Sequence, residues 1–320
     1  MLQDFHIEEH HMDAIKQRVA LDRTLLVADV RALLWEKGFE AAYRTGLGNP
    51  VVSAALGPVS ASSIKAFLLD AMKRGGHIVS STGLDQLELV EMIKSKYDQS
   101  LGQSNPLSGP SKYYGGERRI ESKGDHNHVL IAFGTNGYSD SNETFAAQIL
   151  AAMFDSHQAV QYGSRLSHVP SLRKLQEKHP HVLFQSKVNQ AIDGGLFGIF
   201  ISAPTGVDVK PAIETICHEI RAIVTGTSDF ISSDVVQAAK QRAAFQLSNI
   251  VDSRIEHAEA LATHVLAQNA PLNLHEEISK LQALSTNEFR TCAAKIVSRK
   301  PVFLGLGDLR SLPYADEISP

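Results

Sequence analysis

The chain has 320 residues, 43% of them apolar and 21% charged, which is typical of a globular protein with room for two hydrophobic cores. Its formal net charge of -4 disfavours a nucleic-acid-binding surface, which requires an excess of Lys and Arg. The only cysteines are Cys217 and Cys292, so neither a disulfide framework nor a CxxC metal site is expected. No apolar run approaches the roughly 20 residues that span a bilayer, and the first residues do not form an Arg-rich targeting helix.

The first 98 residues are expected to be mostly helical. Apolar residues at spacings of three and four predict helices at 7–21, 24–43, 60–73 and 84–97, with a short strand at 77–81. Residues 99–111 are polar and contain Gly102, Pro106, Gly109 and Pro110, a composition typical of a linker.

The remainder begins with strands and continues with helices. Alternating apolar residues predict that strands 116–122 and 128–134 pair with each other, and Asp193-Gly194-Gly195 predicts a hairpin between strands 182–191 and 196–203. Helices are expected at 145–154, 209–225, 234–247, 253–268, 274–284 and 286–298, with a final strand at 302–307. This order predicts an α+β fold.

A sequence echo links the two parts. Ile15 to Leu21 matches Ala239 to Phe245, with Lys-Gln-Arg identical in both, and three further short matches follow at separations of about 221 to 225 positions. We therefore expect tandem domains of one kind: an incomplete first domain at 1–98, a linker at 99–111 and a complete second domain at 112–320. The first domain would hold only the later half of the common plan, so the chain is expected to be truncated at its amino terminus.

Four motifs resemble a known family. They are Lys112-Tyr113-Tyr114-Gly115-Gly116-Glu117-Arg118-Arg119, Asp193-Gly194-Gly195-Leu196-Phe197-Gly198, Gln237-Ala238-Ala239-Lys240 and Pro313-Tyr314-Ala315-Asp316-Glu317. In this order and spacing they resemble the core proteins of the mitochondrial ubiquinol-cytochrome c reductase (respiratory complex III), noncatalytic members of the pitrilysin-like metallopeptidase superfamily. The resemblance covers essentially the whole chain and is best from Lys112 onward.

The resemblance implies tandem pitrilysin-like domains and a structural role. It implies a scaffold in the respiratory electron-transport chain, peripheral to the mitochondrial inner membrane on its matrix side, paired with a related core subunit and with other subunits of the complex. It also implies no catalytic residues, no cofactor and no bound metal ion. A scaffold of this kind is expected to depend on its partner subunits for stability.

One pattern points instead to zinc chemistry. His6-Ile7-Glu8-Glu9-His10 matches the H-x-x-E-H signature, in which two histidines one helical turn apart bind zinc and the glutamate activates water. Glu88 and Glu91 could supply a third ligand. The internal repeat, however, aligns this stretch with a late helix of the domain, whereas active peptidases of the superfamily carry the motif near the domain start. We therefore expect no zinc site, and His6, Glu9 and His10 remain the candidates if there is one.

Other candidate sites are weaker. His126 and His128 alternate on a strand, His179 and His181 flank a proline, and His257 and His264 lie two turns apart on one helix. Each pair lacks a third ligand, so we expect surface or structural roles. Gly134-Thr135-Asn136-Gly137 lacks the Lys-Ser/Thr of a phosphate-binding loop.

Two alternative functions stay open. The chain could be a substrate-recognising, noncatalytic subunit of the mitochondrial processing peptidase, although the stretch 161–166, where such a subunit carries a glycine-rich loop, contains one glycine. It could also be a zinc metallopeptidase that uses His6, Glu9 and His10.

Overall fold

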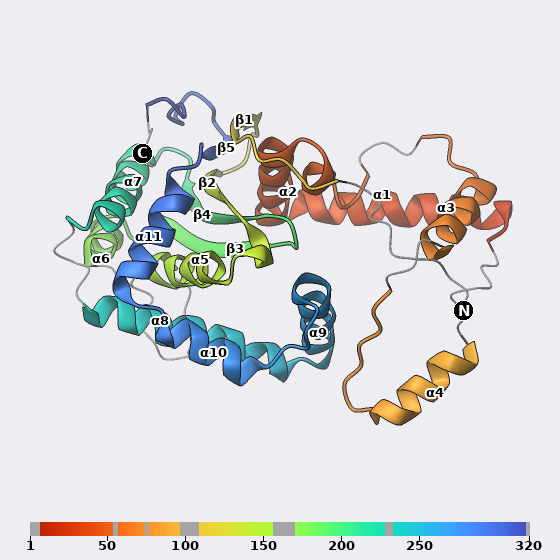
Figure 1. The fold of residues 1–320 in the computed structure, drawn as a ribbon. Helices are drawn as coiled ribbons and strands as arrows, with labels where there is room; N and C mark the ends of the chain where they lie inside the picture. The colour runs from red at the N-terminus through yellow and green to blue at the C-terminus, as the bar shows by residue number, and fades with distance from the viewer. Residues whose placement is uncertain are drawn as a thin grey trace.

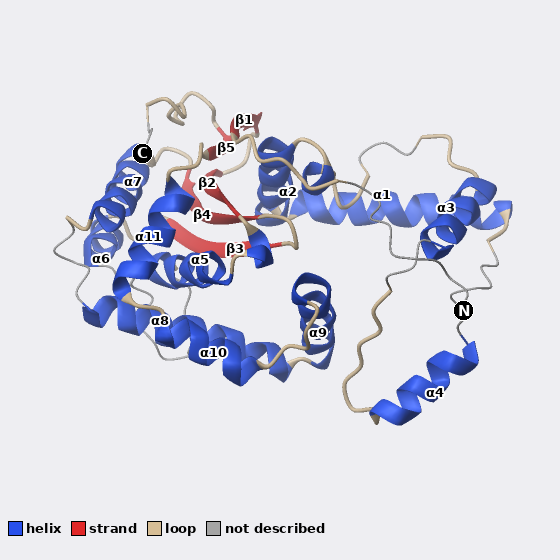
Figure 2. Ribbon diagram, viewed as in Figure 1, coloured by secondary structure: helices blue, strands red, loops and turns tan. Residues whose placement is uncertain are grey.

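The computed structural model of the chain describes residues 7–53, 57–73, 77–96, 109–155, 170–227 and 233–317. A five-stranded sheet lies between helices in the carboxy-terminal part, and most of the amino-terminal helices extend away from it (Figures 1 and 2). The strands are β1 (Gly116–Glu121), β2 (His126–Thr135), β3 (Leu183–Gln190), β4 (Gly195–Pro204) and β5 (Val302–Gly307). The predicted α+β class is confirmed.

The strand order is β1-β5-β2-β4-β3, with β5 parallel to β1 and antiparallel to β2. The prediction that β1 and β2 pair with each other is therefore wrong, because β5 lies between them. All six residues of β5 are buried, so this apolar strand is stabilised by a neighbour on each side. The predicted hairpin of β3 and β4 is confirmed, with Gln190 opposite Gly195 next to the turn.

One face of the sheet carries most of the helices. They are α5 (Ser141–Phe154), α6 (Pro170–Lys178), α7 (Lys210–Thr225), α8 (Ser233–Ser248), α10 (Leu274–Ala283) and α11 (Thr286–Val297). The core between these helices and the sheet includes the fully buried Phe133, Phe184, Phe197 and Phe289. Burial of a large aromatic side chain contributes about 3 kcal/mol, so this core dominates the stability of the fold.

The opposite face is covered by α2 (Val30–Tyr43), which comes from the first 98 residues. Leu34, Ala42 and Tyr43 of α2 pack on Leu130 and Leu304 of the sheet. The helix approaches closely because Gly38 has no side chain: a Cβ there would lie 3.2 Å from Leu130 Cδ2. Part of the predicted first domain thus packs on the sheet of the predicted second domain.

The remaining helices are α1 (Met12–Ala28), α3 (Ala61–Lys73), α4 (Gln86–Lys96) and α9 (Arg254–Gln268), with short 3-10 turns at η1 (Glu9–His11), η2 (Gly46–Gly48), η3 (Gly137–Ser139) and η4 (Asn249–Asp252). The break between α1 and α2 lies at Asp29 and not at 22–23 as predicted. The Asp29 carboxylate accepts the backbone N–H groups of Arg31 and Ala32, so it caps α2. None of the helices in the described ranges combines the length and apolar character that a membrane crossing requires.

Two other expectations concern the region before β1. The predicted strand 77–81 is extended chain without a paired strand among the described residues. Of the predicted linker at 99–111, residues 99–108 lie outside the described ranges. Helix α6 was not predicted.

Candidate functional site

The first candidate contact joins α2 to the β3–β4 hairpin. The Tyr43 hydroxyl donates to the backbone oxygen of Gly195 and accepts from its N–H, both at 2.8 Å. Burial raises the pKa of Tyr43 to about 12, so the phenol stays protonated and can donate. A Cβ on Gly194 would lie 2.7 Å from the Tyr43 oxygen. The Asp193-Gly194-Gly195 motif therefore leaves space for Tyr43 of α2 and hydrogen-bonds to its hydroxyl.

The Tyr113-Tyr114-Gly115 motif connects the chain before β1 to the end of α11. Tyr113 donates its hydroxyl to the backbone oxygen of Lys300 at 2.6 Å, and burial raises its pKa. Gly115 has a φ of +64°, and a Cβ there would lie 2.5 Å from the same Lys300 oxygen. Only glycine fits this position without strain.

Arg119 on β1 holds the chain that follows β5. Its guanidinium donates to the backbone oxygens of Leu309, Leu312 and Pro313, at 2.6, 2.9 and 2.9 Å. It also lies 4.2 Å from the centre of the Tyr314 ring, where a cation–π contact adds to the attraction. Two motifs separated by nearly 200 residues thus meet in one contact.

Lys240 of the third motif is buried within the helical layer. Its ammonium group donates to the backbone oxygens of Leu284 and, at 3.2 Å, Gln282, at the carboxyl end of α10. A cation is stabilised there by the helix dipole and by carbonyl groups that the helix leaves free. Tyr113, Arg119 and Lys240 of the motifs are therefore engaged in contacts that hold the fold together.

Residues 134–137 connect β2 to α5 and to the segment after α11 by hydrogen bonds, and they do not form a phosphate-binding loop. The side chain of Glu143 on α5 is only 1% exposed. It forms a bidentate ion pair with Arg299, in which Arg299 Nη1 lies 2.5 Å from Glu143 Oε1 and Arg299 Nη2 lies 3.1 Å from Glu143 Oε2. Arg299 also donates to Gly134 O at 2.6 Å and Asn136 Oδ1 at 2.9 Å. This network connects the end of β2, α5 and the segment after α11.

The zinc candidates are only partly within the described chain. His6 lies outside the described residues. Glu9 Oε1 accepts the N–H of Ala61 at 3.0 Å, at the start of α3, and His10 Nδ1 lies 3.0 Å from Glu8 Oε2. No cluster of three or more His, Cys, Asp or Glu able to hold a metal ion occurs within the described ranges. The expectation about zinc at His6, Glu9 and His10 stays a prediction.

The histidines of β2 lie on the face that α2 partly covers. His126 Nδ1 lies 2.9 Å from Asp125 Oδ1, and the His128 ring stacks between His126 and Phe200. Burial, followed by the charge of His126, lowers the pKa of His128 below its ordinary 6.5, against an opposing effect of Asp125. The pair makes ring contacts and binds no third ligand group in the described structure.

His128 should make stability depend on pH. The pKa of His128 is lower in the folded chain, so below about pH 6.5 the unfolded chain binds more protons than the folded chain. The stability that neutral His128 provides is therefore present above that pH. It is lost as the pH falls through the folded-state pKa. We expect His128→Gln to flatten the acid side of a plot of unfolding free energy against pH. Urea titrations between about pH 5 and 8 measure this, and an unchanged acid slope would contradict it.

His264 and Glu277 line a small apolar pocket between α5, α9 and α10. His264 Nδ1 lies 2.8 Å from the Ala270 oxygen, and Nε2 lies 4.0 Å from Glu277 Oε1. His181 is exposed, and His179 and His257 are partly exposed. The predicted structural or surface roles fit these positions.

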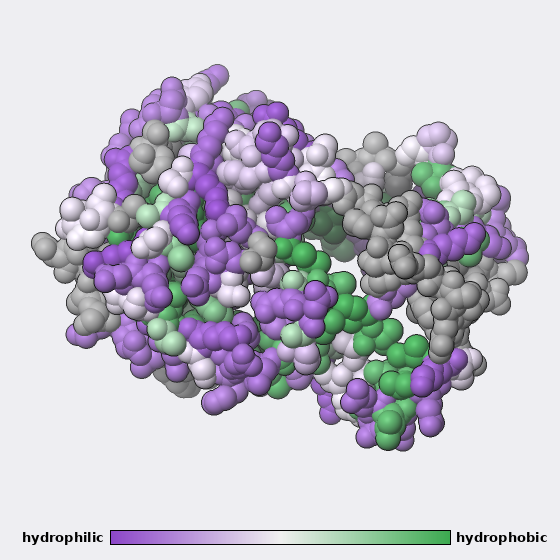
Figure 3. Space-filling model, in the orientation of Figure 1, coloured by the Kyte–Doolittle hydropathy of each residue, from purple (hydrophilic) through white to green (hydrophobic). Residues whose placement is uncertain are grey.

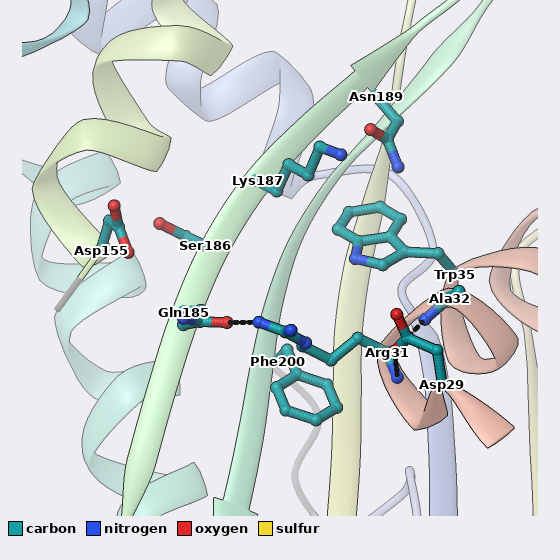
Figure 4. A pocket seen from close by; sticks show the side chains of 10 residues that line it. All are labelled: Asp29, Arg31, Ala32, Trp35, Asp155, Gln185, Ser186, Lys187, Asn189 and Phe200. Carbon is teal, nitrogen blue, oxygen red and sulfur yellow. Dashed lines mark hydrogen bonds between the residues drawn. The ribbon is translucent and has the colours of Figure 1, made fainter. Parts of the chain in front are cut away.

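An open cavity of about 530 Å³ lies beside the edge strand β3 (Figure 4). Trp35 of α2 and Phe200 of β4 supply apolar walls, Lys187 projects from β3, and Arg31 Nη1 donates to Gln185 Oε1 at 3.0 Å. Asp155 pairs with Arg242 at 2.9 Å, and the Ser186 hydroxyl donates to the backbone oxygen of Ala151. The cavity lining therefore offers no nucleophile next to a base.

Both cysteines are buried in the helical layer. Burial raises the pKa of Cys217 to about 11 and also raises that of Cys292, so neither thiol forms the reactive thiolate near neutral pH. We expect iodoacetamide to leave both residues unmodified in the folded chain and to alkylate both in urea, as read by intact-protein mass spectrometry. Alkylation of the folded chain at the unfolded rate would contradict this assignment.

Sequence reasoning found Tyr113, Arg119 and Lys240 as motif residues but missed Tyr43 and the Glu143–Arg299 pair. Glu143 sits three residues after the helix cap Asp140, which is an ordinary place for an acidic residue at a helix start. Arg299 is 156 positions away, and no local pattern connects them.

Comparison with known proteins places the chain next to two related groups of mitochondrial proteins, the subunit 2 proteins of the cytochrome b-c1 complex and the alpha subunits of the mitochondrial processing peptidase. No family model matches the chain.

The particular matches are distant but cover most of the chain. It is 24% identical over 283 residues to cytochrome b-c1 complex subunit 2 of Cryptococcus neoformans, and 21% identical over 291 residues to a probable processing peptidase subunit alpha-2 of Arabidopsis thaliana. These alignments cover 87% and 89% of this chain, which spans 61% and 58% of the two relatives. A chain in the solved complex III2 of Candida albicans with Inz-5 bound superposes with a TM-score of 0.78 at 18% identity, covering 95% of this chain and 73% of that one. The resemblance inferred from the motifs is confirmed, and the fold is shared.

Proposed function

We propose that this chain is a noncatalytic core subunit of the mitochondrial ubiquinol-cytochrome c reductase, respiratory complex III, needed for assembly and stability of the complex. The observation that carries the proposal is the hydrogen bonding of the motif residues. The side chains of Tyr113, Arg119 and Lys240 all donate to backbone oxygens of the same chain. Side chains engaged in this way stabilise a scaffold and do not present chemistry to a substrate.

The proposed location is the matrix side of the mitochondrial inner membrane, where the chain is peripheral. Its proposed partners are the related core subunit 1 and other subunits of the complex. The subunit binds no redox cofactor and no metal ion. Mitochondrial relatives named as subunit 2 of the cytochrome b-c1 complex support this assignment.

A tandem, pitrilysin-like organisation is part of the proposal. Helices α2 and α9 begin 224 positions apart, each after a capping side chain, Asp29 and Ser253 respectively. Helices α3 and α11 begin 225 positions apart, and Ser60 and Ser285 each accept the N–H of the third residue that follows. The nearly equal spacing of these caps supports two copies of one plan, with residues 1–98 holding the later half of the first.

An affinity pull-down tests the assignment. The tagged chain is purified from mitochondria solubilised in mild detergent, and zinc is quantified in the same eluate. We expect cytochrome b, cytochrome c1 and the iron-sulfur subunit to be recovered in constant ratio, without zinc. Their absence would overturn the assignment.

The second candidate is the noncatalytic subunit of the mitochondrial processing peptidase, favoured by relatives that carry that name. Residues 161–166, where a glycine-rich loop would distinguish it, lie outside the described ranges. In the same pull-down, recovery of a single catalytic peptidase subunit identifies this alternative. Stoichiometric zinc on the chain itself would identify the third candidate, a metallopeptidase that uses His6, Glu9 and His10.

A further inference from the structure

The small cavity between α5, α9 and α10 has a polar end at which one atom lacks a hydrogen bond. His264 of α9 and Glu277 of α10 lie at this end, and their side chains are 11% and 14% exposed. His264 Nε2 is fully buried and has no hydrogen-bond partner among the described residues. A buried polar atom without a partner costs free energy, so Nε2 points to a group that enters the cavity and completes its hydrogen bonding.

The other nitrogen of the ring determines what Nε2 can bind. His264 Nδ1 lies 2.8 Å from the backbone oxygen of Ala270. A carbonyl oxygen can only accept, so Nδ1 carries the proton. In the neutral ring, Nε2 is then an acceptor with a free lone pair. The missing group must therefore be a donor.

Glu277 presents a second acceptor opposite Nε2. Its Oε1 lies 4.0 Å from His264 Nε2, which is too far for a direct hydrogen bond. The same oxygen accepts from Lys280 Nζ at 3.0 Å, and Lys280 also lies 3.0 Å from Glu276. One ammonium group thus faces two carboxylates, so this part of α10 retains negative charge. A group with several N–H bonds and a positive charge can bind Nε2 and Oε1 at once.

The rest of the cavity is mostly apolar. Phe145 of α5, Leu247 of α8, Leu272 and Leu274 supply carbon walls. The volume is about 80 Å³. Since an apolar cavity of about 150 Å³ takes benzene, this one has room for a shorter chain of about four carbons.

The polar end lies next to a hydrophilic surface. The side chains of Glu276 and Lys280 are 58% and 48% exposed, and Figure 3 shows a largely hydrophilic surface over α10. A cation at Glu277 would keep part of its hydration there, whereas a cation among the apolar walls would lose it. The cavity therefore provides separate places for a positive charge and for hydrocarbon.

We propose that this cavity binds a small aliphatic monoamine. Its ammonium group lies between His264 Nε2 and Glu277 Oε1, and its hydrocarbon chain lies against Phe145, Leu247 and Leu272. A neutral alcohol has one hydroxyl hydrogen and can donate to only one of the two acceptors. An anion is disfavoured because it would lie beside the Glu277 carboxylate. The inference goes beyond the proposed scaffold role and does not depend on it.

Binding of isobutylamine to the 320-residue chain tests the proposal. The histidine side-chain nitrogen signals are followed by NMR near neutral pH, with the His264 signals assigned by their loss in His264→Gln. We expect saturable binding with a dissociation constant on the order of 1 mM and a shift of the Nε2 signal. Isobutanol, which has the same carbon skeleton without the charge, should bind about tenfold more weakly. Absence of saturable binding, or equal binding of isobutanol, would overturn the proposal.

Two neighbouring glutamates separate a specific contact from a general effect of charge. Glu277→Gln should weaken isobutylamine binding about tenfold, because a charge-assisted hydrogen bond is lost. Glu276→Gln removes the same charge one residue earlier, from a more exposed side chain that also contacts Lys280. It should change the affinity less than about twofold. Equal weakening by the two variants would indicate a general attraction of cations and would refute the site.

A third variant tests where the hydrocarbon chain lies. Ala260 of α9 lines the cavity, so the added carbons of Ala260→Leu would occupy the space that the chain requires. We expect no detectable isobutylamine binding, while the urea unfolding midpoint stays unchanged or rises. Undiminished binding to the folded Ala260→Leu chain would contradict the proposal.

Discussion

We expect Glu143→Gln to lower the free energy of unfolding by about 3 kcal/mol, the lower end of the cost of breaking a buried ion pair by removal of one partner. Glu143 provides both oxygens that receive the Arg299 guanidinium and also accepts the N–H and the side-chain amide of Asn136. The lower end applies because the Arg299 side chain remains 24% exposed, so water compensates part of the lost charge. Urea denaturation followed by circular dichroism measures the change as a shift of the midpoint.

The control for this prediction is Glu121→Gln at the exposed end of β1, which should change the unfolding free energy by less than about 0.5 kcal/mol. The double variant Glu143→Leu/Arg299→Leu should recover part of the loss, because it leaves no charge without a partner. A Glu143→Gln variant as stable as the Glu121→Gln control would show that the ion pair contributes little.

Local sequence patterns determined most of the elements but not the pairing of strands that lie far apart in the sequence. The β3–β4 hairpin was predictable because its turn signal and both strands lie within about twenty residues. The pairing of β1 with β5 was not, because Gly116 and Val302 are neighbours only in the folded chain. Contacts between distant segments are fixed by which apolar faces fit together, and this information does not appear as a period in the sequence.

The extended segment at 77–82 shows that a strand-like sequence pattern does not by itself produce a paired strand. Its pattern predicts a strand, and the proposed repeat would match it with β5, yet no partner strand lies beside it in the described chain. A strand is stabilised by cross-strand pairs and hydrogen bonds, so its sequence alone does not suffice. Likewise, Arg119 and Lys240 were recognisable as motif residues, but their backbone partners became visible only in the structure.

The largest expected effect on α2 comes from Gly38→Leu. A glycine in the middle of a helix costs roughly 0.5–1 kcal/mol relative to alanine, so close packing on the sheet must compensate for it. A Cβ at Gly38 would already lie 3.2 Å from Leu130 Cδ2 and 3.6 Å from Leu304 Cδ1, and a leucine side chain would push α2 off Leu130 and Leu304. We expect a loss of about 3 kcal/mol in unfolding free energy, at the upper end of overpacking costs.

The repeat-related substitution provides the matched comparison. In the proposed repeat, Ala262 on α9 corresponds to Gly38 on α2, but none of the residues of α9 is buried. Ala262→Leu in the isolated chain should therefore change the unfolding free energy by less than about 0.5 kcal/mol. Urea titration of both variants measures the contrast, and equal losses would mean that α9 is already covered in the isolated chain. A larger loss for Gly38→Leu than for Ala262→Leu would show that α2, and not α9, packs closely on a sheet in the isolated chain.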